Sequence, residues 1–116
     1  MVENKSGKEK VQTKTITIEE CEQCLGCVLT YGHFSTIHPG HIRYLRHAKS
    51  LGKKLAIGLI GDKAKAKYNY TQQERTEALT FLGLADYIIL MEDDNLKEVL
   101  EKMKPEVLVL GNEFKE

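Results

Sequence analysis

Short runs of apolar residues alternate along this chain with longer segments in which apolar residues recur every three or four positions. The short runs are typical of β-strands, and the wider spacing is typical of helices that bury one face. The run Leu55–Ile60 contains no polar residue, as expected for a strand that is covered on both sides. The pattern predicts strands at 27–31, 55–60, 87–90 and 107–110, and helices at 39–51, 71–84 and 96–104.

Residues with known preferences for helix ends mark the boundaries of these helices. Pro39 suits the first turn of the first helix, and Gly52 suits its C-terminal stop. Thr71 and Glu74 have the spacing of a capping box, which fixes the start of the second helix. Pro105 ends the third helix, because proline cannot continue a helical hydrogen-bond ladder.

The predicted elements alternate strand and helix from residue 27 to the end of the chain. This order indicates an α/β fold, a Rossmann-like parallel sheet of about four strands with flanking helices and right-handed crossovers. In such sheets ligands bind beyond the carboxyl ends of the strands. Three polar segments follow predicted strands and are expected to converge at that edge, namely 32–41, 61–70 and 111–114.

The N-terminal part of the chain gives a weaker signal. Residues 1–14 are rich in Lys, Glu, Ser and Gln and lack periodicity, so they are interpreted as a disordered tail. The segment 15–24 is ambiguous, with a short helical turn expected around residues 18–20. A length of 116 residues suits one domain, expected over 15–116.

Charge and hydropathy exclude several function classes. The chain has 17 basic and 17 acidic residues, so no net field attracts it to nucleic acid or to an anionic membrane surface. No apolar run approaches the roughly 20 residues that a membrane helix needs. The polar N-terminus lacks the apolar core of a secretory signal. We therefore expect a cytoplasmic protein without nucleic-acid or membrane partners.

The three cysteines, Cys21, Cys24 and Cys27, are clustered with two residues between neighbours. Their odd number does not fit a secreted disulfide framework. A structural zinc needs four ligands, and no second Cys/His pair at finger-like spacing follows. Reduced, structural thiols are therefore favoured, zinc or iron is not expected, and a metal-binding module is the lesser alternative.

The segment from Thr30 to His41 is the most informative stretch for function. His38 and His41 lie three residues apart at a predicted helix start, where free backbone amides and the helix dipole suit a phosphate. Gly32 and Gly40 permit a close approach of the backbone to a ligand. Taken alone, the two histidines are more often surface residues that cap a helix, and metal ligation competes with a phosphate-binding role.

The whole string resembles the signature of the cytidylyltransferase-like nucleotidyltransferases, Thr-x-Gly-x-Phe-Asp-x-x-His-x-Gly-His followed by a helix. The positions that match are Thr30, Gly32, Phe34, His38, Gly40, His41, Leu45, Ala48, Leu51 and Gly52. Downstream, Asp62, Glu74-Arg75 with Leu79, Ala85-Asp86-Tyr87, Lys104–Val109 and Gly111-Asn112-Glu113-Phe114 are similar to later family segments. The likeness spans residues 27–116, is strongest to the adenylyltransferase domain of ADP-heptose synthases, and is next strongest to glycerol-3-phosphate cytidylyltransferases.

The resemblance implies transfer of a nucleoside monophosphate from an NTP to a small phosphorylated sugar or polyol, with release of pyrophosphate. His38 and His41 would bind the triphosphate and stabilise charge on its α-phosphate, and Mg²⁺ would bridge phosphate oxygens. Thr30, Gly32, Phe34, Gly40, Lys65 and Arg75 are expected to bind nucleotide or phosphate. Weaker assignments are Ser35, Lys63, Lys67, Gly111, Asn112 and Glu113.

Several of these residues keep a plain structural alternative. The three lysines of segment 61–70 could be a solvated face, and which of them acts is open. Arg75 could be a surface charge of its helix, and Asn112 and Glu113 could be turn residues after the last strand.

Two departures from the family pattern bear on activity. Ser35 stands where the family has Asp, which removes a charge from the first loop. The chain ends at Glu116, before the family's further strand and helix, so it is either a fragment of a longer protein or its site is incomplete. An exposed sheet edge and a homodimer are expected. A non-catalytic nucleotide-binding domain of the same fold is the alternative function. The base, ATP or CTP, and the acceptor stay open.

Overall fold

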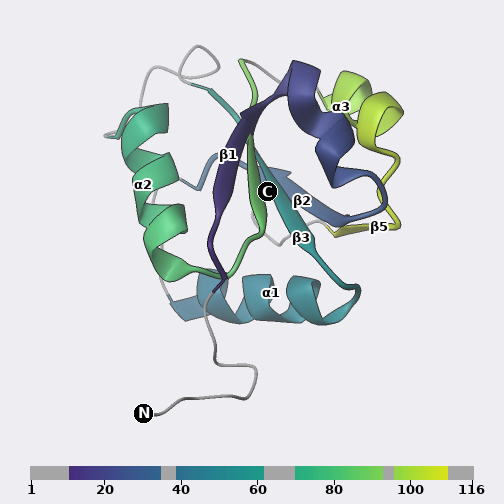
Figure 1. The fold of residues 1–116 in the computed structure, drawn as a ribbon. Helices are drawn as coiled ribbons and strands as arrows, with labels where there is room; N and C mark the ends of the chain where they lie inside the picture. The colour runs from purple at the N-terminus through teal and green to yellow at the C-terminus, as the bar shows by residue number, and fades with distance from the viewer. Residues whose placement is uncertain (1–10, 35–38, 62–69, 93–95, 110–116) are drawn as a thin grey trace.

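Five parallel strands form one sheet in the part of the chain that the structure describes (Figure 1). The structure is a computed structural model and describes residues 11–34, 39–61, 70–92 and 96–109. The elements in chain order are β1 (Lys14–Thr17), the 3-10 helix η1 (Ile18–Cys24), β2 (Val28–Gly32), α1 (Pro39–Ser50), β3 (Leu55–Leu59), α2 (Gln72–Leu82), β4 (Tyr87–Leu90), α3 (Leu96–Met103) and β5 (Val107–Val109).

The strand order across the sheet is β1-β4-β3-β2-β5, and every pair is parallel. In the register of the central strands, Thr30 of β2 lies between Ile57 of β3 and Val109 of β5. The parallel α/β architecture confirms the fold class expected from the sequence. The predicted elements after residue 27 agree with the structure to within one or two residues at each end.

Helices cover both faces of the sheet, as Figure 1 shows, with α1 and α2 on one face and α3 and η1 on the other. All five residues of β3 are buried, which is the reason its sequence carries no polar side chain. The core on the α1 and α2 face includes Val28, Phe34, Leu45, Ala48, Leu55, Ile57, Leu59, Leu79, Ala85 and Ile88. The core on the α3 face includes Ile16, Ile18, Cys21, Cys24, Cys27, Leu29, Ala56, Ile60, Ile89, Met91, Val99 and Met103.

The sheet has one strand more than the sequence pattern predicted. Residues 11–17 run beside β4, where the amide of Val11 donates to the Gly83 carbonyl at 2.8 Å and the Thr13 hydroxyl to the Ala85 carbonyl at 2.7 Å. The expected tail boundary at residue 14 therefore lies too late, since residues 11–14 are already held by the sheet. Residues 1–10 are outside the described part of the chain. The expected helical turn around residues 18–20 is present as the first part of η1.

Asp86 stabilises the sheet at the amino-terminal ends of its strands. Its Oδ2 accepts from the Leu55 amide at 2.9 Å and forms an ion pair with Lys49 Nζ, also at 2.9 Å. This carboxylate joins α1 to the first residue of β3, at the edge opposite the carboxyl ends of the strands. Among the described helices, none is long and apolar enough to cross a bilayer.

Candidate active site

The strand order reverses between β2 and β5. Strands β2, β3 and β4 step across the sheet in one direction, whereas β5 returns to the other side of β2. A crevice for ligands is expected outside the carboxyl ends of the strands at such a point. Helix α1, which follows β2, begins at this edge, so its first turn places Gly40 and His41 there.

The ring of His41 packs against Phe34, which lies just beyond the end of β2. The two ring centroids are 5.8 Å apart with planes inclined at 54°, and Phe34 is buried. Phe34 has a φ of 50°, in the left-handed region that a residue with a Cβ rarely adopts. The backbone turns sharply at Phe34, and its ring packs against His41 in the first helical turn.

Gly32 closes β2 and is buried, and its carbonyl accepts a hydrogen bond of 2.9 Å from the Ile60 amide after β3. The structure therefore gathers four predicted site residues, Gly32, Phe34, Gly40 and His41, into one short stretch beyond β2. His38 and Ser35 belong to the same stretch of sequence but lie outside the described residues.

Thr30 lies inside the fold, against α1. Strand alternation turns it toward α1, on the same face as Val28, and its side chain is completely buried. Its hydroxyl is hydrogen-bonded to the hydroxyl of Tyr44, which donates to the Val109 carbonyl at 2.8 Å. Thr30 thus joins β2 to α1, and its expected contact with phosphate stays a prediction.

Arg75 is buried, so the alternative of a surface charge does not hold. Its side chain is 2% exposed inside the first turns of α2. Nη1 donates to the carbonyls of His33 at 2.6 Å and Ile60 at 2.9 Å, and Nε donates to the carbonyl of Tyr70 at 3.2 Å. Its expected role toward nucleotide or phosphate stays a prediction.

Sequence reasoning missed two side chains that organise this edge. Tyr44 packs from α1 against the core, and its hydroxyl finds its partners there. Gln72, the first residue of α2, donates through Nε2 to the carbonyls of Leu59 and Met91, both at 2.9 Å. No local pattern marked Gln72, because its partners are the last residue of β3 and the residue after β4.

The remaining predicted site residues lie outside the part of the chain that is described. These are Lys63, Lys65, Lys67, Gly111, Asn112 and Glu113, together with His38 and Ser35. Their assignments stay predictions. The strands that precede these segments, β2, β3 and β5, are adjacent and parallel, so their carboxyl ends lie at one edge of the sheet.

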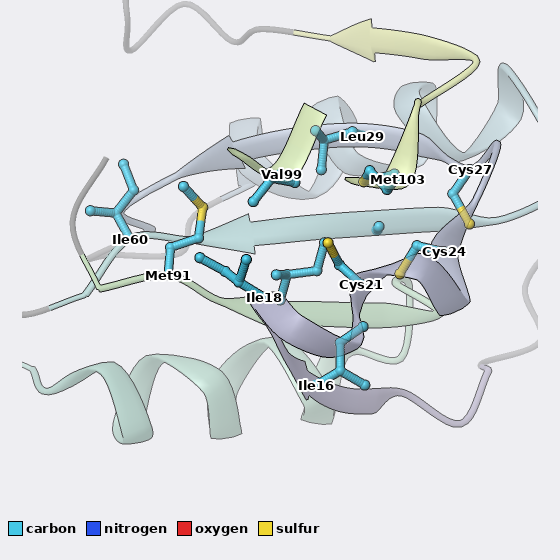
Figure 2. Close-up of a cluster of buried hydrophobic side chains, with 12 residues drawn as sticks. Ile16, Ile18, Cys21, Cys24, Cys27, Leu29, Ile60, Met91, Val99 and Met103 are labelled. Carbon is cyan, nitrogen blue, oxygen red and sulfur yellow. The ribbon is translucent and has the colours of Figure 1, made fainter. Parts of the chain in front are cut away.

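The three cysteines lie in the core between η1, α3 and the sheet, as Figure 2 shows. All three are free and buried. Burial raises the pKa of each thiol, to about 12 for Cys24, where the neighbouring Cys27 and Cys21 thiols add to the effect. Over the described ranges no group of three or more His, Cys, Asp or Glu side chains is arranged to hold a metal ion.

The fold and the edge together define a class. A parallel α/β sheet with a switch point, and a histidine in the first turn of the helix that follows β2, are compatible with a ligand-binding α/β domain. The sequence matches the cytidylyltransferase-like family over residues 29–116. The chain belongs to this family, as the sequence motif indicated.

Relatives agree with this assignment. The Bifunctional protein HldE of Campylobacter concisus is 34% identical over 124 aligned residues, which cover 97% of this chain and 26% of that protein. The Bifunctional protein HldE of Magnetococcus marinus is 33% identical, covering 77% of this chain and 20% of that protein. The corresponding protein of Geobacter metallireducens is 34% identical, with coverages of 84% and 21%. The chain thus spans between 20% and 26% of these curated relatives.

A solved structure shares the fold. The lipopolysaccharide core biosynthesis protein of Thermoplasma volcanium aligns with a TM-score of 0.65 at 25% identity, covering 72% of this chain and 72% of that one. The alignment supports the Rossmann-like sheet and its helices in this chain.

Proposed function

We propose that the chain transfers a nucleoside monophosphate from an NTP to the phosphate of a small phosphorylated sugar or polyol. The observation that carries the proposal is the position of His41, in the first turn of α1 at the switch point, with its ring packed on Phe34. An imidazole beside a helix N-terminus, where backbone amides point outward, is suited to stabilise charge on a phosphate.

In the proposed reaction an oxygen of the acceptor phosphate attacks the α-phosphorus of the NTP. The new P–O bond forms as the bond to the β-phosphate oxygen breaks, and pyrophosphate leaves with its electron pair. No enzyme nucleophile is needed, so the side chains act by position and charge. His41 and His38 stabilise the α-phosphate, and the backbone at Gly32, Phe34 and Gly40 approaches the triphosphate.

The segments outside the described residues supply the remaining proposed contacts. Lys65, with Lys63 and Lys67, offers positive charge to the acceptor phosphate or the triphosphate. Ser35 offers a hydroxyl, and Gly111, Asn112 and Glu113 follow β5 on the other side of the crevice. Support comes from chain order alone, because each segment directly follows a strand that ends at this edge.

Mg²⁺ would neutralise phosphate charge and bridge phosphate oxygens during the transfer. We propose that the ion arrives with the triphosphate. A sugar acceptor is supported by the structural neighbour, which is named for the biosynthesis of lipopolysaccharide core, a sugar-containing material.

Pyrophosphate release measures the proposed activity directly. The purified chain is incubated with ATP or CTP and Mg²⁺ against a panel of sugar and polyol phosphates. His41→Ala should reduce turnover by about 100-fold or more, whereas His47→Ala, an exposed histidine on the same helix, should leave it unchanged. Equal activity of the two variants, or no turnover with any acceptor, would remove the proposal.

A non-catalytic nucleotide-binding role is the second candidate, favoured by Ser35 in place of the family's Asp. Calorimetry with a non-hydrolysable NTP separates the two. Tight binding without pyrophosphate release across the panel supports this second role, and turnover contradicts it.

A homodimer is proposed on a separate ground. Strand β5 is a sheet edge and carries Leu108, which is 38% exposed. Sedimentation of the chain across a concentration series tests this, and a monomer at all concentrations contradicts it.

A further inference from the structure

Cys24 and Cys27 stand at the two ends of a tight turn between η1 and β2. The Cys27 amide donates to the Cys24 carbonyl at 2.9 Å, which closes the turn. Leu25, at φ −51° and ψ 125°, and Gly26, at φ 80°, have the conformation of the central residues of a type II β-turn. Glycine takes this positive φ without strain, so the sequence between the two cysteines suits the turn that it forms.

The turn brings the two cysteines to a separation that a disulfide can span. The end residues of a β-turn have Cα atoms less than about 7 Å apart, and disulfides join Cα atoms about 4.4–6.8 Å apart. The Cys24 and Cys27 thiols are hydrogen-bonded to each other. Figure 2 shows the two residues side by side at one end of the buried cluster, with Cys21 further along it. A bond between the two sulfurs therefore requires side-chain rotation and leaves the backbone turn in place.

A hollow on the surface leads to one of the two sulfurs. It has a volume of about 530 Å³ and lies where β2, β3 and β5 begin, and its lining includes Cys27, Lys53, Lys54 and Glu106. Leu25 at its rim is 63% exposed. Of the three cysteines, all of which the structure describes, Cys27 alone lines this hollow, whereas Cys21 and Cys24 are completely buried. A small molecule that enters from solvent therefore meets Cys27 first.

The surroundings of the two thiols also distinguish them. Burial raises the pKa of both. The hydrogen bond between them raises the pKa of Cys24 further and lowers that of Cys27, so the Cys24 S–H donates to the Cys27 sulfur. The carboxylate of Asp86 adds to the rise at Cys27, while the charges of Lys54 and Lys49 lower the pKa there. Cys27 is thus the sulfur better placed to lose its proton and act as the nucleophile.

We infer that Cys24 and Cys27 form a thiol–disulfide exchange site, which takes small-molecule disulfides through the hollow and closes to an intrachain disulfide across the β-turn. Cys27 is the attacking sulfur, and Cys24 is the sulfur that completes the bond. Cys21 remains a thiol. The site lies at the edge of the sheet opposite the carboxyl ends of the strands, and the inference does not depend on the proposed function.

The exchange proceeds in two steps that balance. The Cys27 thiol gives its proton to solvent, and the thiolate attacks one sulfur of the small disulfide, so a mixed disulfide forms and one thiolate leaves and takes up a proton. The Cys24 thiol then loses its proton and attacks the Cys27 sulfur, which breaks the mixed disulfide and releases the second small thiol. Two protein thiols are oxidised to one disulfide, and the small disulfide is reduced to two thiols.

The test uses the identical spacing of the two possible neighbouring pairs, since two residues separate Cys21 from Cys24 and Cys24 from Cys27. The folded chain and the chain in denaturing urea are each incubated with oxidised glutathione and quenched in acid. Remaining thiols are alkylated, and mass spectrometry of the fragmented peptides locates the disulfide. The folded chain should form the Cys24–Cys27 bond in about tenfold excess over the Cys21–Cys24 bond. In urea the two bonds should form in comparable amounts.

Single variants test the order of the steps. Cys24→Ala should accumulate a glutathione mixed disulfide on Cys27, because the second sulfur is missing. Cys27→Ala should react at least about tenfold more slowly than wild type, because its remaining thiols do not reach the hollow. Cys21→Ala is the matched control and should form the disulfide at the wild-type rate. Far-UV circular dichroism establishes that each variant is folded, and the pairing in wild type decides for any variant that is not.

Four results would overturn the inference. The folded chain could give the same mixture of bonds as the chain in urea, or it could give mainly the Cys21–Cys24 bond. It could remain reduced after about 100 times the period that oxidises it in urea, which would make the thiols purely structural. Folded Cys27→Ala could acquire glutathione as fast as wild type, which would place the attacking sulfur elsewhere.

Discussion

The hydroxyl of Tyr44 on α1 donates a hydrogen bond of 2.8 Å to the carbonyl oxygen of Val109 on β5. The same hydroxyl is bonded to Thr30, which lies beside Val109 in the sheet register. Tyr44 is one helical turn beyond His41, so the helix that carries the histidine is joined to both strands that flank the switch point. One tyrosine hydroxyl therefore joins α1, which carries His41, to both β2 and β5.

Tyr44→Phe should lower the free energy of unfolding by about 1–3 kcal/mol, because the Val109 carbonyl and the buried Thr30 hydroxyl both lose a partner. Thr30→Val should cost a similar amount, and the double variant should cost less than the sum of the two. Urea denaturation of the four proteins measures this. Tyr70→Phe, at an exposed ring, is the control and should change stability little. Additive losses at Tyr44 and Thr30 would contradict a shared network.

At Phe34, substitution by glycine should destabilise the protein less than substitution by alanine, which is the reverse of the usual order. Alanine keeps the Cβ that is strained at a φ of 50°, whereas glycine accepts this conformation freely. We therefore expect Phe34→Gly to be more stable than Phe34→Ala by about 1 kcal/mol, with both less stable than wild type through loss of the buried ring. Thermal and urea unfolding check this, and a more stable alanine variant would mean that the backbone is relaxed.

Alanine substitutions at Gly61 and Gly26 distinguish the cost of steric crowding from the cost of a left-handed backbone conformation. A Cβ at Gly61 meets two backbone oxygens at 2.6 Å, whereas Gly26, with a φ of 80°, has nothing within 4 Å. Gly61→Ala should therefore cost about 2–3 kcal/mol and reduce activity, because the shift occurs at the entrance of segment 61–70, which carries the three lysines. Gly26→Ala should cost about 1 kcal/mol and leave kcat/KM unchanged. The comparison fails if the two variants behave alike in both assays.

The buried thiols make stability fall at alkaline pH. Burial, reinforced by Cys27 and Cys21, raises the pKa of Cys24 from 9.0 to about 12. Above pH 9 the unfolded chain releases this proton and the folded chain retains it, so the stabilisation present below pH 9 is lost as the pH rises toward 12. Each such group contributes a slope of about 1.4 kcal/mol per pH unit. The free energy of unfolding of wild type and of Cys24→Ala is measured by denaturation at several values between about pH 8 and 11. It should fall less steeply with pH in the variant. Equal pH dependence of the unfolding free energy in the two proteins would contradict this prediction.

Most of the fold was predictable because the burial of its strands is visible as apolar runs in the sequence. β3 is apolar at every position, since both of its faces are covered, and the capping box at Thr71 and Glu74 marked the start of α2 to the residue. β1 was not predictable in this way. Its sequence offers one buried residue, Ile16, and its stability comes from pairing with β4, more than 70 residues away in the chain.

The candidate site was predictable in outline and not in its inner contacts. Chain order and the family motif placed Gly32, Phe34, Gly40 and His41 together, and the structure agrees. The motif did not reveal that Thr30 and Arg75 turn inward, because their partners are a tyrosine hydroxyl and backbone carbonyls. Carbonyls are present at every residue, so no pattern in the side chains identifies which of them a buried arginine will meet.

The direction of β1 has a practical consequence for handling the protein. Because β1 runs parallel to β4, the chain enters the sheet at the amino ends of the strands, beside Gly83 and Asp86. The edge that we propose to bind nucleotide lies at the opposite ends of the strands. An affinity handle, a fluorophore or a surface anchor joined ahead of Val11 would therefore start from the far side of the sheet, so immobilised protein should remain accessible to its substrates.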